Sequence, residues 1–256
     1  MNVFVTGLGG YLGRAITAVD PGASGIEGRA AADVRDAGAL DALLDAARPD
    51  AVIHTAYVQV GPDARSVNVQ GSATVAEAAR ARGLRLVHVS TDVVFDGKLG
   101  RPIREDDPLS PVTEYGATKA DAERAVLAAH PGAVLVRTSL IYGGAEPANH
   151  ERAALDPERT FFTDEIRCPV AAPDLAAALL ELAARPEIRG PLNVAGADAV
   201  SRFEFAQLVA AANGRAAASI KGAPRPLDRP GDLRLDCSLG NRLLRTRMRG
   251  AREVLG

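Results

Sequence analysis

The chain has 256 residues, of which 47% are hydrophobic, and its formal net charge at pH 7 is −2. This length fits one large α/β domain, or a domain with an added lobe. The small charge gives no electrostatic reason to expect nucleic acid or a membrane as partner, and no apolar run approaches the ~20 residues of a membrane helix. Because the chain opens on a strand-like stretch and holds only two cysteines, we expect no secretory signal and a reducing compartment, the cytoplasm.

Strands and helices alternate through the first half of the chain. Apolar runs predict strands at 2–6, 24–27, 51–56, 85–90 and 133–138. Apolar residues at helical spacing predict a helix that begins near Leu12 and further helices at 39–47, 64–82 and 115–129. Such alternation is typical of the α/β class, and it predicts a doubly wound parallel sheet, the Rossmann type, with helices on both faces.

The pattern loosens after Tyr142, where residues 143–170 are rich in charge, glycine and proline. Beyond them the sequence predicts a helix at 174–184, a strand at 192–195 and a helix from Ser201, where Glu204 completes a capping box. We therefore expect a dinucleotide-binding core at 1–142 and a mixed region at 143–256. The mixed region would return to the core and form a small C-terminal substrate-binding lobe.

A glycine-rich segment, GLGGYLG at 7–13, lies between the first predicted strand and the first helix. In a dinucleotide site, Gly7 would permit the tight turn, Gly10 would let the pyrophosphate approach the main chain, and Gly13 would let the helix pack close to the sheet. Tyr11 and Leu12, at the start of the helix, belong to the same predicted cofactor site. Three glycines alone also fit a structural turn, but the strand before them and the helix after them favour a dinucleotide.

Charged residues after the second strand bear on the choice of cofactor. Glu27 lies where an acid binds the ribose hydroxyls in NAD enzymes, whereas Arg29 could bind the 2′-phosphate of NADP. Asp33, followed by Val34, is a candidate for the adenine edge. Solvated loop charges are the alternative. The sequence favours NADPH and leaves NADH open.

Tyr115 and Lys119 are four residues apart on a predicted helix and so share one face. A tyrosine needs a neighbouring cation to act in acid–base chemistry near neutral pH, and a lysine can supply that charge. Ser90 and Thr91 end the fourth strand, at the sheet edge where ligands bind in open α/β sheets. These residues predict a carbonyl reductase in which Thr91 hydrogen-bonds the substrate. No metal-ligand spacing surrounds His54 or His88, so we expect no metal.

Motifs along nearly the whole chain resemble the extended short-chain dehydrogenase/reductase superfamily and, more narrowly, its dTDP-4-dehydrorhamnose reductase-like branch. They are VTGLGGYLG at 5–13, AVIHTAY at 51–57, VNVQG at 67–71, STDVVFDG at 90–97, YGATK at 115–119, RTSLIYG at 137–143, PDLAAAL at 173–179, NVAG at 193–196 and RLDCS at 234–238. The pair STDVVFDG and YGATK is quite specific to that branch.

The resemblance implies an NAD(P)H-dependent reductase of the 4-keto group of a nucleotide-linked deoxysugar, and a possible homodimer. It implies a catalytic set of Thr91, Tyr115 and Lys119. It places near the cofactor, besides the glycine segment, Thr55, Ala56, Tyr57, Asn68, Ser90, Tyr115, Lys119 and Thr138. It places near the substrate Thr91, Asp92, Val93, Tyr115 and Glu165.

Several residues depart from the branch. Val93 stands where tyrosine is usual, and in the expected substrate loop Glu165 replaces glutamine and Arg167 replaces glycine. The segment 144–160 is short. These departures keep two alternatives open: an NAD(P)-dependent reductase or epimerase acting on another substrate, and a dinucleotide-binding regulatory subunit without catalysis.

Overall fold

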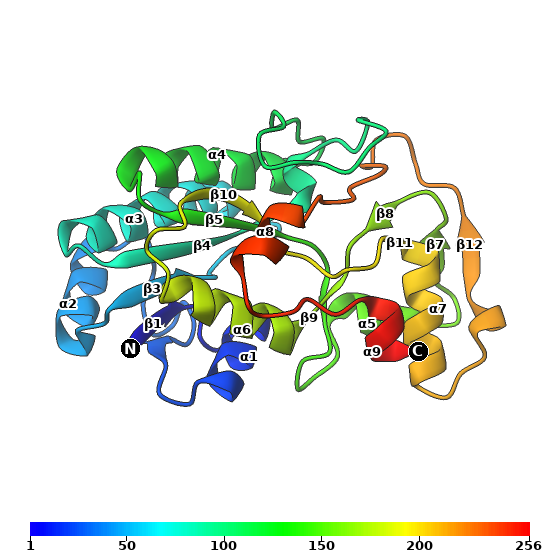
Figure 1. The fold of residues 1–256 in the computed structure, drawn as a ribbon, viewed down its shortest axis with the longest axis horizontal. Coiled ribbons are helices and arrows are strands. Elements are labelled where there is room, and N and C mark those ends of the chain that lie inside the picture. Colours follow the sequence, from blue (N-terminus) through cyan, green and yellow to red (C-terminus); the bar gives the residue numbers. More distant parts are fainter.

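A six-stranded parallel sheet forms the centre of the protein in a computed structural model that describes all of residues 1–256 (Figure 1). Its strands lie in the order β10-β5-β4-β3-β1-β2, and every neighbouring pair is parallel. The bounds are β1 (Val3–Thr6), β2 (Ser24–Ile26), β3 (Ala51–His54), β4 (Arg85–Thr91), β5 (Val134–Thr138) and β10 (Gly190–Asn193). The predicted fold class, a doubly wound parallel sheet, is confirmed.

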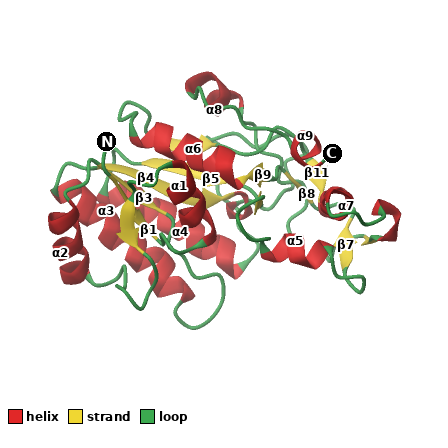
Figure 2. Cartoon of the chain, turned by 90° about the horizontal axis from the view of Figure 1, so that it is seen from below, coloured by secondary structure: helices red, strands yellow, loops and turns green.

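Helices cover both faces of the sheet because its strands are apolar on both sides. Val3 and Val5 pack into a core with α1 (Tyr11–Val19) and α6 (Ala172–Ala183). Phe4, which lies between them, points to the opposite core. That second core is formed with α2 (Ala37–Ala47), α3 (Ser72–Ala81) and α4 (Glu114–Ala129) (Figure 2). No helix has both the length and the apolar character needed to cross a bilayer.

The strand order creates a crevice at one edge of the sheet. From β1 the chain goes to β2 on one side, and it then pairs β3 with the other side of β1. Loops that leave the carboxyl ends of β1 and β3 therefore diverge, and open α/β sheets bind ligands at such a point. The glycine segment follows β1 directly, so the topology brings it to this crevice.

Two predicted details differ from the structure. The helix expected at 64–82 is present without interruption over 64–81, but its part Ser66–Gly71 is π-helical before α3 begins, which was not predicted. At Gly71 a Cβ would lie 2.6 Å from Val34 Cγ2, so the chain approaches its neighbour too closely there for a larger residue. The capping box at Ser201 is only half formed, because its hydroxyl accepts from the Glu204 N–H at 2.9 Å while the Glu204 carboxylate binds Arg252.

The second half of the chain crosses repeatedly between the sheet and a smaller lobe. The lobe contains β6 (Ile141–Tyr142), α5 (Asn149–Ala154), β7 (Thr160–Phe162), β8 (Ile166–Arg167), β9 (Val170–Ala171), β11 (Val200–Ser201), α7 (Arg202–Ala212), β12 (Lys221–Ala223) and α9 (Ala251–Leu255). Between these segments, β10 joins the main sheet, α6 packs against it, and α8 (Ser238–Leu243) packs on β10 (Figure 1). The division at 142/143 into two domains stays a prediction.

Candidate active site

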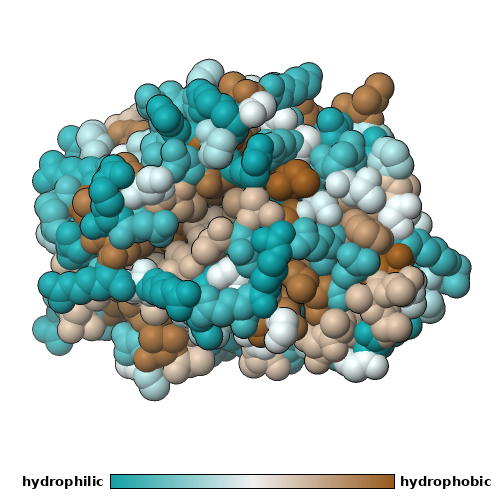
Figure 3. Space-filling model, turned by 45° about the vertical axis from the view of Figure 1, so that its right-hand side comes forward, coloured by the Kyte–Doolittle hydropathy of each residue, from teal (hydrophilic) through white to brown (hydrophobic).

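A cleft of about 1120 Å³ runs between the carboxyl edge of the sheet and the lobe (Figure 3). Its walls include the ends of β1, β3, β4 and β5, the start of α4, and the segments around α5 and α7. All residues predicted to bind cofactor or substrate line this cleft, except Asn68 and Asp92. The sequence-based prediction therefore assigned to one site residues that are more than 150 positions apart, from Gly7 to Glu165, and the fold places them in one cleft.

The glycine segment has the conformation that a dinucleotide site requires. Gly7 has φ +75°, a left-handed conformation that side chains disfavour, and at Gly13 a Cβ would lie 2.3 Å from the Gly7 carbonyl oxygen. Gly10 precedes α1 and supplies no side-chain cap. The first N–H groups of the helix therefore face the cleft without partners, as in phosphate-binding turns. Thr138 Oγ1, which is buried in the same cleft, also has no partner. The residues present thus fit a dinucleotide.

Charged residues at the end of the cleft predicted to hold the adenine form a closed network. Arg29 donates to Asp33 at 3.1 Å and to Asp63 at 2.9 Å. Arg35 also binds Asp33, at 2.6 Å, and holds the pKa of that carboxyl well below its usual range. Both Asp33 oxygens are therefore engaged, whereas the Arg29 side chain keeps 51% of its surface exposed. Glu27 also lines the cleft.

Asn68 lies beneath the cleft instead of on its surface. Its side-chain amide donates to Val58 O at 2.8 Å and to Thr118 Oγ1 at 2.9 Å, and its Oδ1 accepts from Val58 N–H at 2.8 Å. Asn68 therefore ties the loop after β3 to α4, one residue before Lys119. The side chain is 1% exposed, so it supports the cofactor end from behind.

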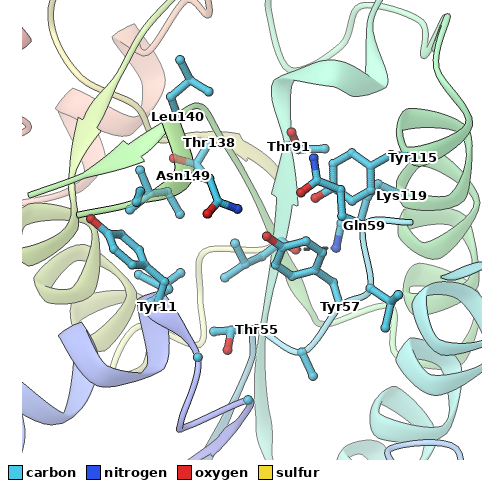
Figure 4. Close-up of a pocket in the computed structure, with 18 of the residues that line it drawn as sticks. Tyr11, Thr55, Tyr57, Gln59, Thr91, Tyr115, Lys119, Thr138, Leu140 and Asn149 are labelled. Atoms are coloured by element: carbon cyan, nitrogen blue, oxygen red, sulfur yellow. Dashed lines mark hydrogen bonds between the residues drawn. The ribbon is translucent and has the colours of Figure 1, made fainter. Parts of the chain in front are cut away.

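Tyr115 lies in the first turn of α4 and points into the cleft near Thr91 (Figure 4). Gly116 permits this placement, because a Cβ there would lie 2.2 Å from Val93 O. Thr113 caps the helix by accepting from Gly116 N–H at 3.0 Å. Burial raises the pKa of Tyr115, and Tyr57, whose ring centroid is 5.7 Å away, raises it further. The phenol therefore keeps its proton at neutral pH.

Lys119 lies one turn further along α4 and is 4% exposed. Its Nζ donates to Val89 O at 2.7 Å and lies 3.4 Å from His88 Nε2. Burial lowers the pKa of Lys119 to about 8. We expected Lys119 to lower the pKa of Tyr115, but with its ammonium directed at Val89 it is not among the groups that shift that pKa here.

The hydroxyls at the end of β4 have different surroundings. Thr91 Oγ1 makes only long contacts, 3.3 Å to Asp92 Oδ1 and 3.4 Å from Val93 N–H, so it remains available to a substrate oxygen. Ser90 Oγ donates to Glu123 at 2.5 Å, and Glu123 pairs with buried Arg137. Ser90 is thus engaged in the interior.

The two strand histidines lie inside the fold. His54 Nδ1 lies 2.6 Å from Thr6 Oγ1 and its Nε2 lies 2.9 Å from Ser72 Oγ, as expected for a satisfied interior residue. His88 Nδ1 is buried without a partner, because only its Nε2 approaches Lys119. The structure contains no cluster of three or more histidine, cysteine, aspartate or glutamate side chains able to hold a metal ion.

An ion-pair network forms the wall that faces Tyr115. Asp92 is fully buried and binds both the Arg167 guanidinium, with Nε to Oδ2 at 2.7 Å, and Ser139 Oγ at 2.6 Å. Glu165 is also fully buried, and it pairs with Arg167 at 3.5 Å and with Arg229 at 2.9 Å. Asp92 therefore positions Arg167 from behind the cleft surface. Of these residues, all but Asp92 line the cleft.

Sequence reasoning missed most polar residues of this lobe wall, among them Arg202, Arg229 and His150. It noted Arg167 only as a departure from the branch. Each is a single charged or aromatic residue in a segment without a motif, so no local signal could have identified it.

Tyr11 joins the glycine segment to the lobe. Its hydroxyl donates to Glu151 Oε2 at 3.1 Å and accepts from Gly144 N–H at 2.8 Å. Burial raises the pKa of Tyr11 to about 12, so this donor stays protonated. This predicted cofactor residue therefore also ties the glycine segment to the lobe.

Comparisons with known proteins agree over the whole chain. The family model described as the RmlD substrate binding domain matches residues 1–256. The dTDP-4-dehydrorhamnose reductase of Mycolicibacterium smegmatis is 33% identical over 99% of this chain and 84% of its own. Methionine adenosyltransferase 2 subunit beta of Pongo abelii is 29% identical over 93% and 80%. A solved dTDP-4-dehydrorhamnose reductase from Clostridium acetobutylicum has TM-score 0.86 and 25% identity, covering 100% and 97%.

Proposed function

The chain belongs to the family of the RmlD substrate binding domain, in the extended short-chain dehydrogenase/reductase superfamily, and on this premise we propose that it reduces the 4-keto group of a nucleotide-linked deoxysugar with NAD(P)H. The resemblance read from the motifs is thereby confirmed. The observation that carries the proposal is the convergence of Tyr115, Lys119 and Thr91 on the cleft that also holds the glycine segment.

Each member of this set has a role that fits its surroundings. Tyr115, which keeps its proton because of burial, donates it to the carbonyl oxygen. Thr91 Oγ1, which has only long contacts, donates a hydrogen bond to the same oxygen. Lys119 holds the nicotinamide ribose. For its charge to stabilise the phenolate left after proton transfer, its ammonium must turn from Val89 O toward Tyr115 when the cofactor binds. The bound nicotinamide cofactor supplies the hydride.

The cofactor is proposed to be NADPH, with NADH possible. The glycine segment would hold the pyrophosphate and the exposed part of Arg29 would bind the 2′-phosphate. A solved relative from Bacillus anthracis, similar in fold at TM-score 0.88 and 23% identity, was crystallised with NADP. Placement in the cytoplasm and a homodimer stay predictions, and sedimentation velocity would test the dimer.

The substrate class follows from the relatives and from the lobe wall. Relatives named dTDP-4-dehydrorhamnose reductase, and one named a probable 4-ketoreductase of a dTDP-linked sugar at 33% identity, favour a nucleotide-linked 4-keto sugar. The departures at Val93, Glu165 and Arg167 leave the identity of the sugar open.

The test is oxidation of NADPH and NADH by the purified protein with a panel of nucleotide-linked 4-keto sugars, among them dTDP-4-dehydrorhamnose. We expect turnover with at least one of them, and none with free sugars. If the protein binds NADPH tightly but turns over no member of the panel, the function is wrong and a regulatory subunit takes its place. The relative named methionine adenosyltransferase 2 subunit beta makes that alternative concrete.

A further inference from the structure

Two polar side chains in the lobe wall of the cleft have no partner within the protein. Arg202, the first residue of α7, lines the cleft, and its guanidinium makes neither an ion pair nor a hydrogen bond. His150, on α5, has a buried Nε2 without a partner and lines the same cleft. Buried polar groups are normally hydrogen-bonded, and a guanidinium lining a cleft is normally paired with an anion. The buried His150 Nε2 and the half-buried, unpaired Arg202 therefore point to groups supplied by a ligand.

The neighbours of Arg202 cannot neutralise it. Arg167 is engaged by Asp92 and Glu165, and Arg229 is engaged by Glu165 and stacks over the Phe162 ring at 4.9 Å. Three guanidiniums therefore face two carboxylates, which leaves one positive charge without a carboxylate. Burial lowers the pKa of Arg202 to about 10, and repulsion by Arg167 adds to this effect. An anion bound at Arg202 would relieve both costs.

The His150 ring requires a hydrogen-bond donor from the ligand, in contrast to Arg202. The main chain of Ile141 raises the pKa of His150, as a carbonyl that accepts from the ring would, and Nε2 is the ring nitrogen that lies buried without a partner. We assign the ring proton to Nδ1 on this ground, which leaves a lone pair on Nε2. Burial, together with Arg202 and Arg167, lowers the pKa of His150 to about 3, so the ring is neutral at physiological pH. Its free nitrogen therefore accepts a hydrogen bond, for which a hydroxyl is a suitable donor.

We propose, resting on the function above, that Arg202 and His150 form the substrate subsite that recognises a sugar joined to a phosphoryl group. Arg202 donates to the phosphoryl oxygens and His150 Nε2 accepts from a sugar hydroxyl. Arg202, His150 and Tyr115 line the same cleft, so a sugar held by the subsite occupies the cleft that also contains the proton donor.

The phosphoryl half is tested by calorimetry on the NADPH-loaded protein with thymidine diphosphate and with thymidine. Thymidine diphosphate should bind the wild type, and Arg202→Gln should weaken it about 10- to 100-fold, the effect of one charge-assisted hydrogen bond. Thymidine affinity and NADPH affinity should not change. Arg247→Gln, which alters an exposed arginine outside the cleft, is the matched control. Arg202→Lys keeps the charge and should recover part of the affinity.

The hydroxyl half is tested by His150→Phe, whose ring can keep the packing against Phe205. This variant should bind thymidine diphosphate like the wild type, yet lose about 3- to 10-fold in kcat/KM for the sugar substrate. Equal binding of thymidine diphosphate and thymidine by the wild type, or full affinity in Arg202→Gln, would overturn the subsite. If Arg202→Gln does not fold, two other measurements test the subsite. They are the preference of the wild type for thymidine diphosphate over thymidine, and the loss of thymidine diphosphate affinity in Arg202→Lys. Diphosphate binding that depends on Arg202, without turnover of any keto sugar, would refute the function and keep the subsite.

Discussion

The two ends of the cleft differ in which part of the chain forms them: main chain at one end and charged side chains at the other. The glycine end is formed by main chain that follows β1, where Gly7 and Gly13 allow a close turn and the first N–H groups of α1 face the cleft. The lobe wall is formed by charged side chains from distant segments, joined by the buried pairs of Asp92 and Glu165 with arginines. A site made of main chain is specified locally, whereas a site made of ion pairs depends on the whole fold. The lobe is therefore where relatives can change substrate.

The largest expected effect comes from a variant that removes the proton donor and leaves both ends of the cleft intact. Tyr115→Phe removes only the proton donor, so turnover should fall by about 10²–10⁴ while NADPH affinity is kept. Stopped-flow and fluorescence titration measure the two quantities. Tyr142→Phe is the matched control, because its hydroxyl is buried without a partner outside the cleft. Near-full activity of Tyr115→Phe would show that another group donates the proton.

Removing a buried charge should break the lobe wall and spare the glycine end. Asp92→Asn takes the nearest counter-ion from buried Arg167, so the free energy of unfolding should fall by about 3–5 kcal/mol. NADPH affinity at a temperature where the variant is folded should not change. Urea titrations check this, with Glu253→Gln, which alters an exposed pair, expected to cost less than about 1 kcal/mol. Equal stabilities would mean that the network is not needed for the wall.

The converse variant should spare the fold and break the glycine end. In Gly10→Leu the side chain would occupy the space of the pyrophosphate, so NADPH affinity should fall about 100-fold, the loss of one or two charge-assisted hydrogen bonds. Thymidine diphosphate should still bind. Gly38→Ala, in the exposed helix α2, should change neither affinity. Unchanged NADPH binding in Gly10→Leu would place the dinucleotide elsewhere.

The pH profile tests Lys119. Since its pKa is lowered to about 8, its charge is present below that pH and is lost as the pH rises through it. The kcat/KM for ketone reduction should therefore fall above pH 8, by about tenfold per unit at most. In Lys119→Arg the charge persists, so this inflection should vanish whatever the remaining rate. A wild-type profile that is flat from pH 7 to pH 9.5 would speak against the role given to the lysine.

The smallest effect concerns cofactor choice. Arg29 is half exposed and already paired with Asp33 and Asp63, so its contribution to the free energy of binding a 2′-phosphate should be small. Arg29→Ala should lower the preference for NADPH over NADH about fivefold, measured as a ratio of kcat/KM values. Arg65→Ala, an exposed arginine paired with Asp121, should leave the ratio alone. A wild type that prefers NADH would make Glu27 the decisive residue.

The sequence predicted those parts of the site that local rules control. Glycines at a turn, apolar strands and a tyrosine–lysine pair one helical turn apart all have short-range signatures, and Tyr115 and Lys119 do line the cleft. Asn68 and Asp92 were predicted on its surface but lie behind it, because sequence spacing does not tell which way a side chain points.

The rest of the lobe depends on contacts that no segment reveals. Arg202 and His150 come together only because α5 and α7 pack against each other across fifty residues of chain. The close approach of Gly71 to Val34, which lies on another element, likewise has no signature in the residues around Gly71. In each case the deciding neighbour is distant in sequence.

The repeated crossing of the chain between sheet and lobe has a mechanical consequence. Two bodies joined by a single linker can rotate about it. Here the chain instead crosses between sheet and lobe at several places, next to β6, β9 and β11 and around α8. Rotation about one crossing segment would stretch the others, and the hydrogen bond from Tyr11 to Glu151 adds a further connection. Entry and exit of molecules should therefore be governed by short loops at the rim, such as the one that carries exposed Tyr57 and Val60, while the two bodies move as one.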